Sequence, residues 1–109
     1  MLKPIALHIL LALAERDSHG YGVMQAIRER SDGQVPVQTA SFYRHLARLM
    51  DEGLVAESAA RRESVDPRRG AYYRITPRGR QVLAAEKRQL TRLVAQFNKL
   101  RLNPRKADA

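Results

Sequence analysis

The segment from Gln38 to Met50 carries the side chains best suited to a chemical task. From Thr39 to Met50 it has no acidic residue, and it is short enough to form one helix. Its polar groups are Gln38, Thr39, Ser41, Tyr43, Arg44 and Arg48. Arginine can bind guanine with two hydrogen bonds, glutamine can bind adenine or a phosphate, and hydroxyl groups donate to phosphates. The segment therefore favours contact with duplex DNA, although such arginines also occur on ordinary solvated helix faces.

A second group of cations lies between Ala59 and Gly70. The flanking stretches 54–58 and 71–76 predict two strands, so this group would occupy the tip of a hairpin. Its arginines are Arg61, Arg62, Arg68 and Arg69. Arginine at such a tip can follow the DNA backbone or enter a minor groove. A loop kept soluble by its charge is the alternative.

The charge of the whole chain also indicates a polyanionic partner. The sequence has 20 basic and 11 acidic residues, for a net charge of +9. Residues 77–109 hold nine of the basic and two of the acidic residues, which gives +7 of the total. Nucleic acid is the first expectation and an anionic surface the second. Arg78 and Arg80 would lie near the base of the hairpin, where they could reach phosphates.

The composition gives little indication of catalysis or metal binding. There is no cysteine, and His8, His19 and His45 are scattered without metal-ligand spacing. The pairs Ser18–His19 and Ser41–His45 lack a third catalytic member. We therefore expect no enzyme activity, no metal and no cofactor.

The first residues could be mistaken for a targeting segment. The apolar run from Ile5 to Ala14 resembles a weak signal peptide, but a bilayer span needs roughly 20 residues. Pro4 before the run and Glu15 after it favour a buried helix. We expect a cytoplasmic protein without a membrane partner.

The elements that must position these groups follow from periodicity and stop signals. Helices are expected over 4–16, 21–30, 40–52 and 77–102, with an extended link over 34–37 and the two strands between the third and fourth helices. This order predicts a mainly α fold with a small β-hairpin, in which a winged helix-turn-helix precedes a long C-terminal helix. The expected units are 1–76 for DNA binding, 77–102 for dimerisation and 103–109 as a flexible basic tail.

The last predicted helix has a seam typical of helix pairing. Its leucines and phenylalanine recur at heptad spacing, with Glu86 in one seam position. The seam residues are Leu83, Leu90, Leu93, Phe97 and Leu100. Because the first helix is apolar on nearly every face, a second subunit is expected to cover part of it as well.

At this point the chain resembles the PadR-type repressors over nearly its whole length. The motifs that carry the resemblance are Ile9-Leu10-Leu11-Ala12-Leu13, His19-Gly20-Tyr21-Gly22-Val23-Met24-Gln25-Ala26-Ile27, Phe42-Tyr43-Arg44-His45-Leu46-Ala47-Arg48-Leu49, Glu52-Gly53-Leu54-Val55 and Tyr72-Tyr73-Arg74-Ile75-Thr76-Pro77-Arg78-Gly79. The resemblance implies a homodimer, joined mainly by its last helix, that binds a palindromic operator and usually represses. It also implies that Tyr43 faces the DNA. The family usually has Ser-Pro-Gly-Thr before this tyrosine, whereas this chain has Gln38-Thr39-Ala40-Ser41, so the entry angle of the third helix is open.

Three further expectations remain. Tyr21 is interpreted as a packing residue with a satisfied hydroxyl, with phosphate contact as the second possibility, and His19 as a cap or packing residue. A small-molecule effector of unknown identity could act at the dimer interface. In the alternative function, the chain is a basic module that binds a protein or an anionic surface through its C-terminal helix.

Overall fold

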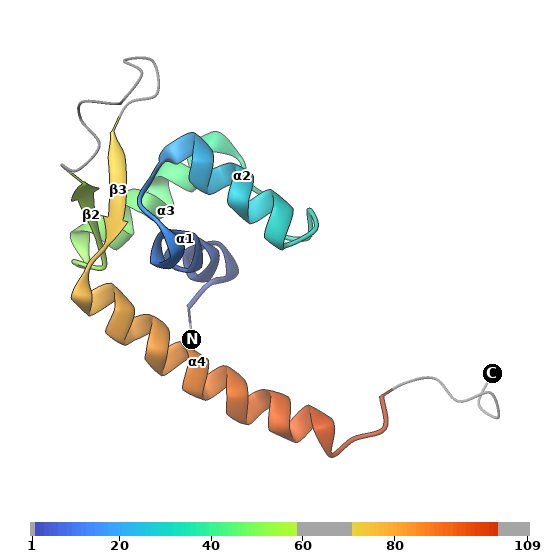
Figure 1. Ribbon diagram of the computed structural model, residues 1–109. Helices are drawn as coiled ribbons and strands as arrows, with labels where there is room; N and C mark the ends of the chain where they lie inside the picture. Colours follow the sequence, from blue (N-terminus) through green and yellow to red (C-terminus); the bar gives the residue numbers. More distant parts are fainter. Residues whose placement is uncertain (1, 59–70, 103–109) are drawn as a thin grey trace.

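The computed structural model describes residues 2–58 and 71–102. Its helices are α1 (Pro4–Glu15), α2 (Gly20–Arg30), α3 (Thr39–Asp51) and α4 (Pro77–Asn98), and its strands are β1 (Ser18–His19), β2 (Val55–Ser58) and β3 (Tyr72–Ile75). Figure 1 shows α2 and α4 on opposite sides of α1, with β2 and β3 standing at one end. The predicted winged helix-turn-helix followed by a long helix is confirmed.

The core forms where the apolar stripes of the first three helices meet the sheet. Ile9, Leu10 and Leu13 of α1 are almost fully buried, as are Phe42 and Leu46 of α3. Val23 and Ile27 of α2 and Val55 of β2 complete this cluster. Because these side chains come from four elements, the burial of their apolar surface fixes α3 against the rest of the unit.

The helix ends are set by the stop signals in the sequence. Gly53 follows α3 with a φ of 76°, and the N–H groups of Gly53 and Leu54 donate to the carbonyls of Met50 and Leu49. This is the pattern of a helix closed by a left-handed glycine. At the start of α4, the Thr76 hydroxyl accepts from the Gly79 N–H at 3.0 Å, and Pro77 takes the first helical position.

The sheet has one strand more than the predicted hairpin. The order is β1-β3-β2, with Ser18 opposite Tyr73 and His19 opposite Tyr72. The sequence indicated only a break at 17–20, because a two-residue strand has no alternation to detect and depends on the edge that β3 offers. The limits of the other elements agree with the expected ranges to within one residue, except at the end of α4, which stops at Asn98 instead of the expected Leu102.

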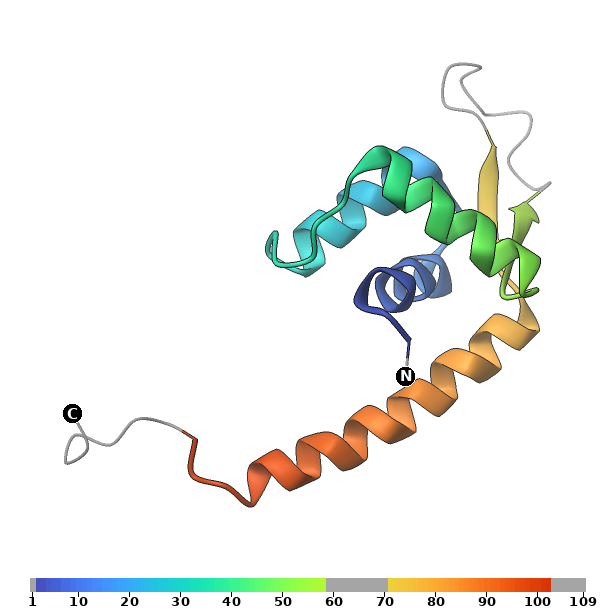
Figure 2. The same cartoon turned by 180° about the vertical axis from the view of Figure 1, so that it is seen from behind.

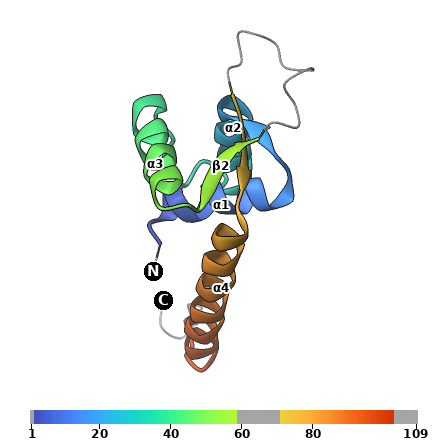
Figure 3. The same cartoon turned by 90° about the vertical axis from the view of Figure 1, so that its left-hand side faces the viewer.

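Helix α4 belongs to the packed unit only over its first half. Gly79 and Glu86 are buried and Leu83 packs against the core, whereas every residue from Thr91 to Asn98 is exposed. Figure 3 shows α4 extending away from the other three helices. A helix of this length with an exposed apolar side has part of its surface left for another molecule.

Candidate nucleic-acid interface

Helix α3 separates its apolar and polar residues onto two faces. Phe42, Leu46 and Leu49 are buried, as predicted, and Met50 is half-buried. The predicted contact residues are turned to the other side: all are exposed except Ser41, which is half-buried. The exposed ones are Gln38, Thr39, Tyr43, Arg44 and Arg48. The predicted polar residues of this helix are therefore accessible to a ligand, with Ser41 partly so.

The start of α3 is open to a ligand. Gln38 occupies the N-cap position, but its side chain makes no capping hydrogen bond, and the first turn holds no acidic residue. The first intrahelical bond runs from the Phe42 N–H to the Gln38 carbonyl at 2.8 Å. The N–H groups of the first turn therefore lack intrahelical acceptors, and with the helix dipole they favour an anion such as a phosphate.

Tyr43 sits where α3, α2 and the sheet approach each other. Its ring meets that of Phe42 edge to face, with 5.0 Å between the centroids, and it remains 41% exposed. A Cβ on Gly20 would lie 3.0 Å from the Tyr43 Cζ, so the missing side chain of Gly20 leaves room for this ring. The tyrosine is thus held in place while one side of it stays accessible.

Two titrating groups beside this face stay neutral near pH 7. Burial lowers the pKa of His45, and the charges of Lys3, Arg48 and Arg44 lower it further. Burial raises the pKa of Tyr73, with smaller contributions from Tyr43 and Glu57. The positive charge of α3 therefore comes from its arginines and not from its histidine.

The start of α2 is built by His19. Its Nδ1 accepts a hydrogen bond from the Gly22 N–H at 2.9 Å, and its ring lies edge to face with Tyr72 at 5.4 Å. The interpretation of His19 as a capping and packing residue is confirmed. The expected satisfied hydroxyl of Tyr21 is confirmed, since it accepts from the Gln25 side chain at 3.0 Å. Its ring stacks on that of His19 with 6.4 Å between the centroids, but Tyr21 is 58% exposed and is not a core residue.

Comparison with known protein families identifies the class of protein to which this chain belongs. The model of the "Transcriptional regulator PadR-like family" matches residues 9–85. The chain belongs to the PadR-like family of transcriptional regulators. The matched range runs from within α1 through the helix-turn-helix and the sheet into the packed half of α4. Membership of the PadR-like family implies regulation through DNA binding.

Solved structures show the same fold. A transcriptional regulator from Clostridium thermocellum is 27% identical, with a TM-score of 0.72 and coverage of 88% of each chain. A PadR family transcription regulator from Clostridium difficile is 20% identical, with a TM-score of 0.73 and coverage of 89% of this chain and 97% of that one. The regulator BldR from Sulfolobus solfataricus is 26% identical, with a TM-score of 0.65 and coverage of 94% and 65%. No curated protein matches the sequence.

The residues of the predicted seam on the C-terminal helix of this PadR-like regulator differ in their burial. Leu83 packs within its own chain, and the buried Glu86 accepts a hydrogen bond from the Leu2 N–H at 2.9 Å. Farther along, Leu93 and Phe97 are exposed to 39% and 51%. Leu100 is also exposed but lies beyond the helix end. Glu86 thus interrupts the heptad because it holds the N-terminal segment of its own chain.

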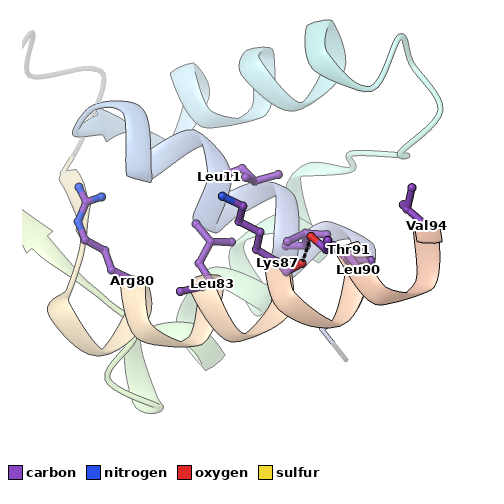
Figure 4. A pocket seen from close by; sticks show the side chains of 9 residues that line it. Leu11, Arg80, Leu83, Lys87, Leu90, Thr91 and Val94 are labelled. Carbon is purple, nitrogen blue, oxygen red and sulfur yellow. Dashed lines mark hydrogen bonds between the residues drawn. The ribbon is translucent and has the colours of Figure 1, made fainter. Parts of the chain in front are cut away.

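A groove of about 560 Å³ separates α1 from α4. Figure 4 shows Leu83 and Lys87 of α4 rising toward Leu11 of α1, with Arg80 at one end and Val94 at the other. Arg80 also donates to the Ala14 carbonyl at 3.4 Å, at the C-terminal end of α1. The Arg80 guanidinium is thus turned toward α1, and contact of Arg78 and Arg80 with phosphates stays a prediction.

Some of the predicted residues and segments lie outside the part of the chain that the structure describes. The four wing arginines and residues 103–109 lie outside the described part of the chain. In the described part there is no cluster of three or more histidine and acidic side chains that could bind a metal. The described helices include none with the length and apolarity to cross a bilayer.

Sequence reasoning missed a line of polar residues on α2. Tyr21, Gln25 and Arg28 are linked side chain to side chain, and Arg28 also reaches the Val37 carbonyl. Their spacing of four and three residues places them on one helix face, which is the signal that could have found them.

Proposed function

We propose that this regulator is a homodimer that binds a palindromic operator and represses transcription by occupying it. One observation carries the proposal: the uncapped, acid-free start of α3 and the outer ends of β2 and β3 lie on the side of the molecule away from α4 (Figure 2). A duplex can therefore approach α3 without meeting the helix that we assign to dimerisation. Such a protein works where the DNA is, so we also propose a cytoplasmic location.

The occupant that we propose for the groove is a second copy of the chain. The groove is lined by Leu7, Leu11, Leu83, Leu90 and Val94, and the exposed Phe97 continues its apolar surface along α4. An apolar helix face next to an apolar groove on the same chain suits a self-complementary interface, in which each copy supplies both parts. The same interface would be the place for a small-molecule effector, because a change in dimer geometry moves the two α3 helices.

Residues 1–76 then act as the DNA-binding unit and 77–102 as the dimerisation helix. In each copy Arg44 reads a guanine, Gln38 reads an adenine or a phosphate, and Thr39, Ser41, Tyr43 and Arg48 hold the backbone. The wing residues Arg61, Arg62, Arg68 and Arg69 contribute backbone or minor-groove contacts. Two such units read half-sites about one helical turn, or roughly 34–36 Å, apart.

The experiment that tests the function is selection of bound fragments from genomic DNA by the purified full chain. A palindromic motif supports the proposal, and enrichment of no sequence at moderate salt contradicts it. On the selected site, Arg44→Ala should cost about 1–3 kcal/mol, or roughly 5- to 150-fold in affinity, and relax the preference at one base position. Arg88→Ala, which removes an exposed arginine from α4, is the matched control and should leave that preference intact.

A second candidate function is favoured by the charge of α4. Its cations are all exposed, while its acidic residue, Glu86, is buried; beyond Arg78 and Arg80 in the first turn, these cations are Lys87, Arg88 and Arg92. This pattern would also suit a module that binds an acidic protein or an anionic surface. Sedimentation with anionic and neutral vesicles distinguishes the two functions, since an operator-binding repressor should stay in solution with both.

A further inference from the structure

A line of hydrogen bonds runs along the exposed face of α2 and ends at the link to α3. The Gln25 Nε2 donates to the Tyr21 hydroxyl at 3.0 Å, and the Arg28 Nη1 donates to the Gln25 Oε1 at 3.0 Å. The Arg28 Nη2 donates to the Val37 carbonyl at 3.3 Å. One guanidinium therefore joins the middle of α2 to the residue just before the N-cap of α3.

The first half of this link, shown in Figure 2 between α2 and α3, is fixed by local bonds. Asp32 and Gly33 have φ values of 53° and 74°, and the Gly33 N–H donates to the Arg28 carbonyl at 3.0 Å. The Ser31 hydroxyl then accepts from the Val35 N–H at 3.2 Å. These bonds end before Pro36, so they determine how the chain leaves α2 but not how it enters α3.

The Arg28 bond acts on the entry itself. The Val37 carbonyl and the Gln38 N–H belong to one rigid peptide plane, so holding the oxygen orients the backbone at Gln38. The Gln38 side chain makes no capping hydrogen bond to α3 that would orient the backbone at Gln38 as well. The direction of the Gln38 side chain, and that of the Thr39 side chain, therefore depends on the orientation of the peptide plane that Arg28 holds.

We propose that Arg28 is a positioning residue that sets the entry of α3 and thereby the base preference of Gln38. The proposal rests on the proposed function, because it assumes that α3 reads DNA. It assigns to Arg28 a role in selectivity without contact to the duplex. The role needs a guanidinium, since two nitrogens must donate to two acceptors in a fixed fork, and the ammonium of lysine is a single flexible point charge.

The test compares Arg28→Lys, Arg28→Ala and the wild-type full chain on the selected operator and on a random duplex, from 50 to 200 mM salt. We expect both variants to lower the ratio of specific to random affinity about 2- to 10-fold, the effect of one lost exposed hydrogen bond. The salt slope of the lysine variant should equal that of the wild type. Arg30→Lys is the matched control, because Arg30 lies on the same helix and pairs with Glu15 instead of the link.

Two results would overturn the proposal. The first is that Arg28→Lys keeps the wild-type ratio of specific to random affinity, while Arg28→Ala reduces the slope of log affinity against log salt by about 0.9. This result would mean that Arg28 contacts a phosphate. The other is an unchanged ratio in both variants. If the Arg28 variants do not fold, Gln25→Ala decides, because it frees one arm of the fork: a lowered ratio supports the proposal and an unchanged ratio overturns it. A wild-type chain that prefers no duplex would instead contradict the proposed function.

Discussion

Replacing Gly79 by alanine should loosen the joint between the sheet and α4. A Cβ at this position would collide with the Leu54 carbonyl oxygen and would lie 2.7 Å from the Ile75 Cγ1 and 3.2 Å from the Leu54 carbonyl carbon. The nearest of these atoms is backbone and cannot rotate away. That carbonyl also accepts the Thr76 N–H at 3.0 Å, so moving it disturbs a second bond.

The magnitude follows from three effects. Overpacking at a rigid site costs about 1–3 kcal/mol. Displacing Gly79 weakens its bond to the Thr76 hydroxyl, and loss of such a cap costs about 1 kcal/mol. The better helix propensity of alanine returns up to about 1 kcal/mol. We therefore expect a net loss of about 1–3 kcal/mol, a large share of the 5–15 kcal/mol that stabilises a typical domain.

Urea denaturation of the wild type, Gly79→Ala and Gly22→Ala measures this loss. Gly22 is the matched control, because it holds the same position after its N-cap, where the His19 ring accepts its N–H. The nearest atom to a Cβ there is the Ser18 hydroxyl, which can rotate at the cost of its hydrogen bond to the His19 carbonyl. The helix propensity of alanine offsets most of that cost, so this variant should change stability by less than about 1 kcal/mol. A Gly79→Ala protein as stable as Gly22→Ala would refute the reasoning.

Two other changes test the loop and the interface. Asp32→Gly should stabilise the chain by about 0.5–1 kcal/mol, since Asp32 holds a φ of 53° that glycine adopts without strain; urea denaturation checks this, and a loss of stability would contradict it. Phe97→Glu should weaken the dimer at least about tenfold, because it places a charge in an apolar interface, while Gln96→Glu adds the same charge beside it and should have a smaller effect. Sedimentation at several concentrations measures both, and equal dissociation constants would count against a seam that includes Phe97.

The order of elements could be predicted because most of their limits are local. Proline at the start of α1 and α4, Gly53 after α3 and the 3.6-residue stripe of α3 are visible without tertiary information. Strand β1 was not predictable, since two residues become a strand only when β3 lies beside them. The end of α4 was placed too late, because exposed helix ends are decided by few contacts.

The candidate site was predictable in its residue types more than in its geometry. The exposed face of α3 followed from periodicity, but the support around it did not. Two contacts provide this support: the Tyr43 ring lies against Gly20, and Arg28 donates to the Val37 carbonyl. Each contact joins two segments that come together only when the whole unit packs. The sequence shows Glu86 as a charge in an apolar seam, which indicates a special partner for it. That partner, the Leu2 N–H, could not be predicted because it lies 84 positions away.

The arrangement of charge constrains how salt should act on this regulator. The duplex is proposed to meet the side of α3, whereas Lys87, Arg88 and Arg92 belong to α4, which Figure 2 shows on the other side of α1 from α3. Since only cations near phosphates release counterions, the salt slope of binding should reflect α3 and the wing and not the net charge of +9. In the proposed dimer, pairing through α4 would bring the α4 cations of two copies closer together, and salt would screen their repulsion. We therefore expect added salt to lower the affinity for DNA and to raise the affinity between subunits. The two effects differ in sign because the proposed DNA-binding and dimerisation surfaces lie on opposite faces of the fold.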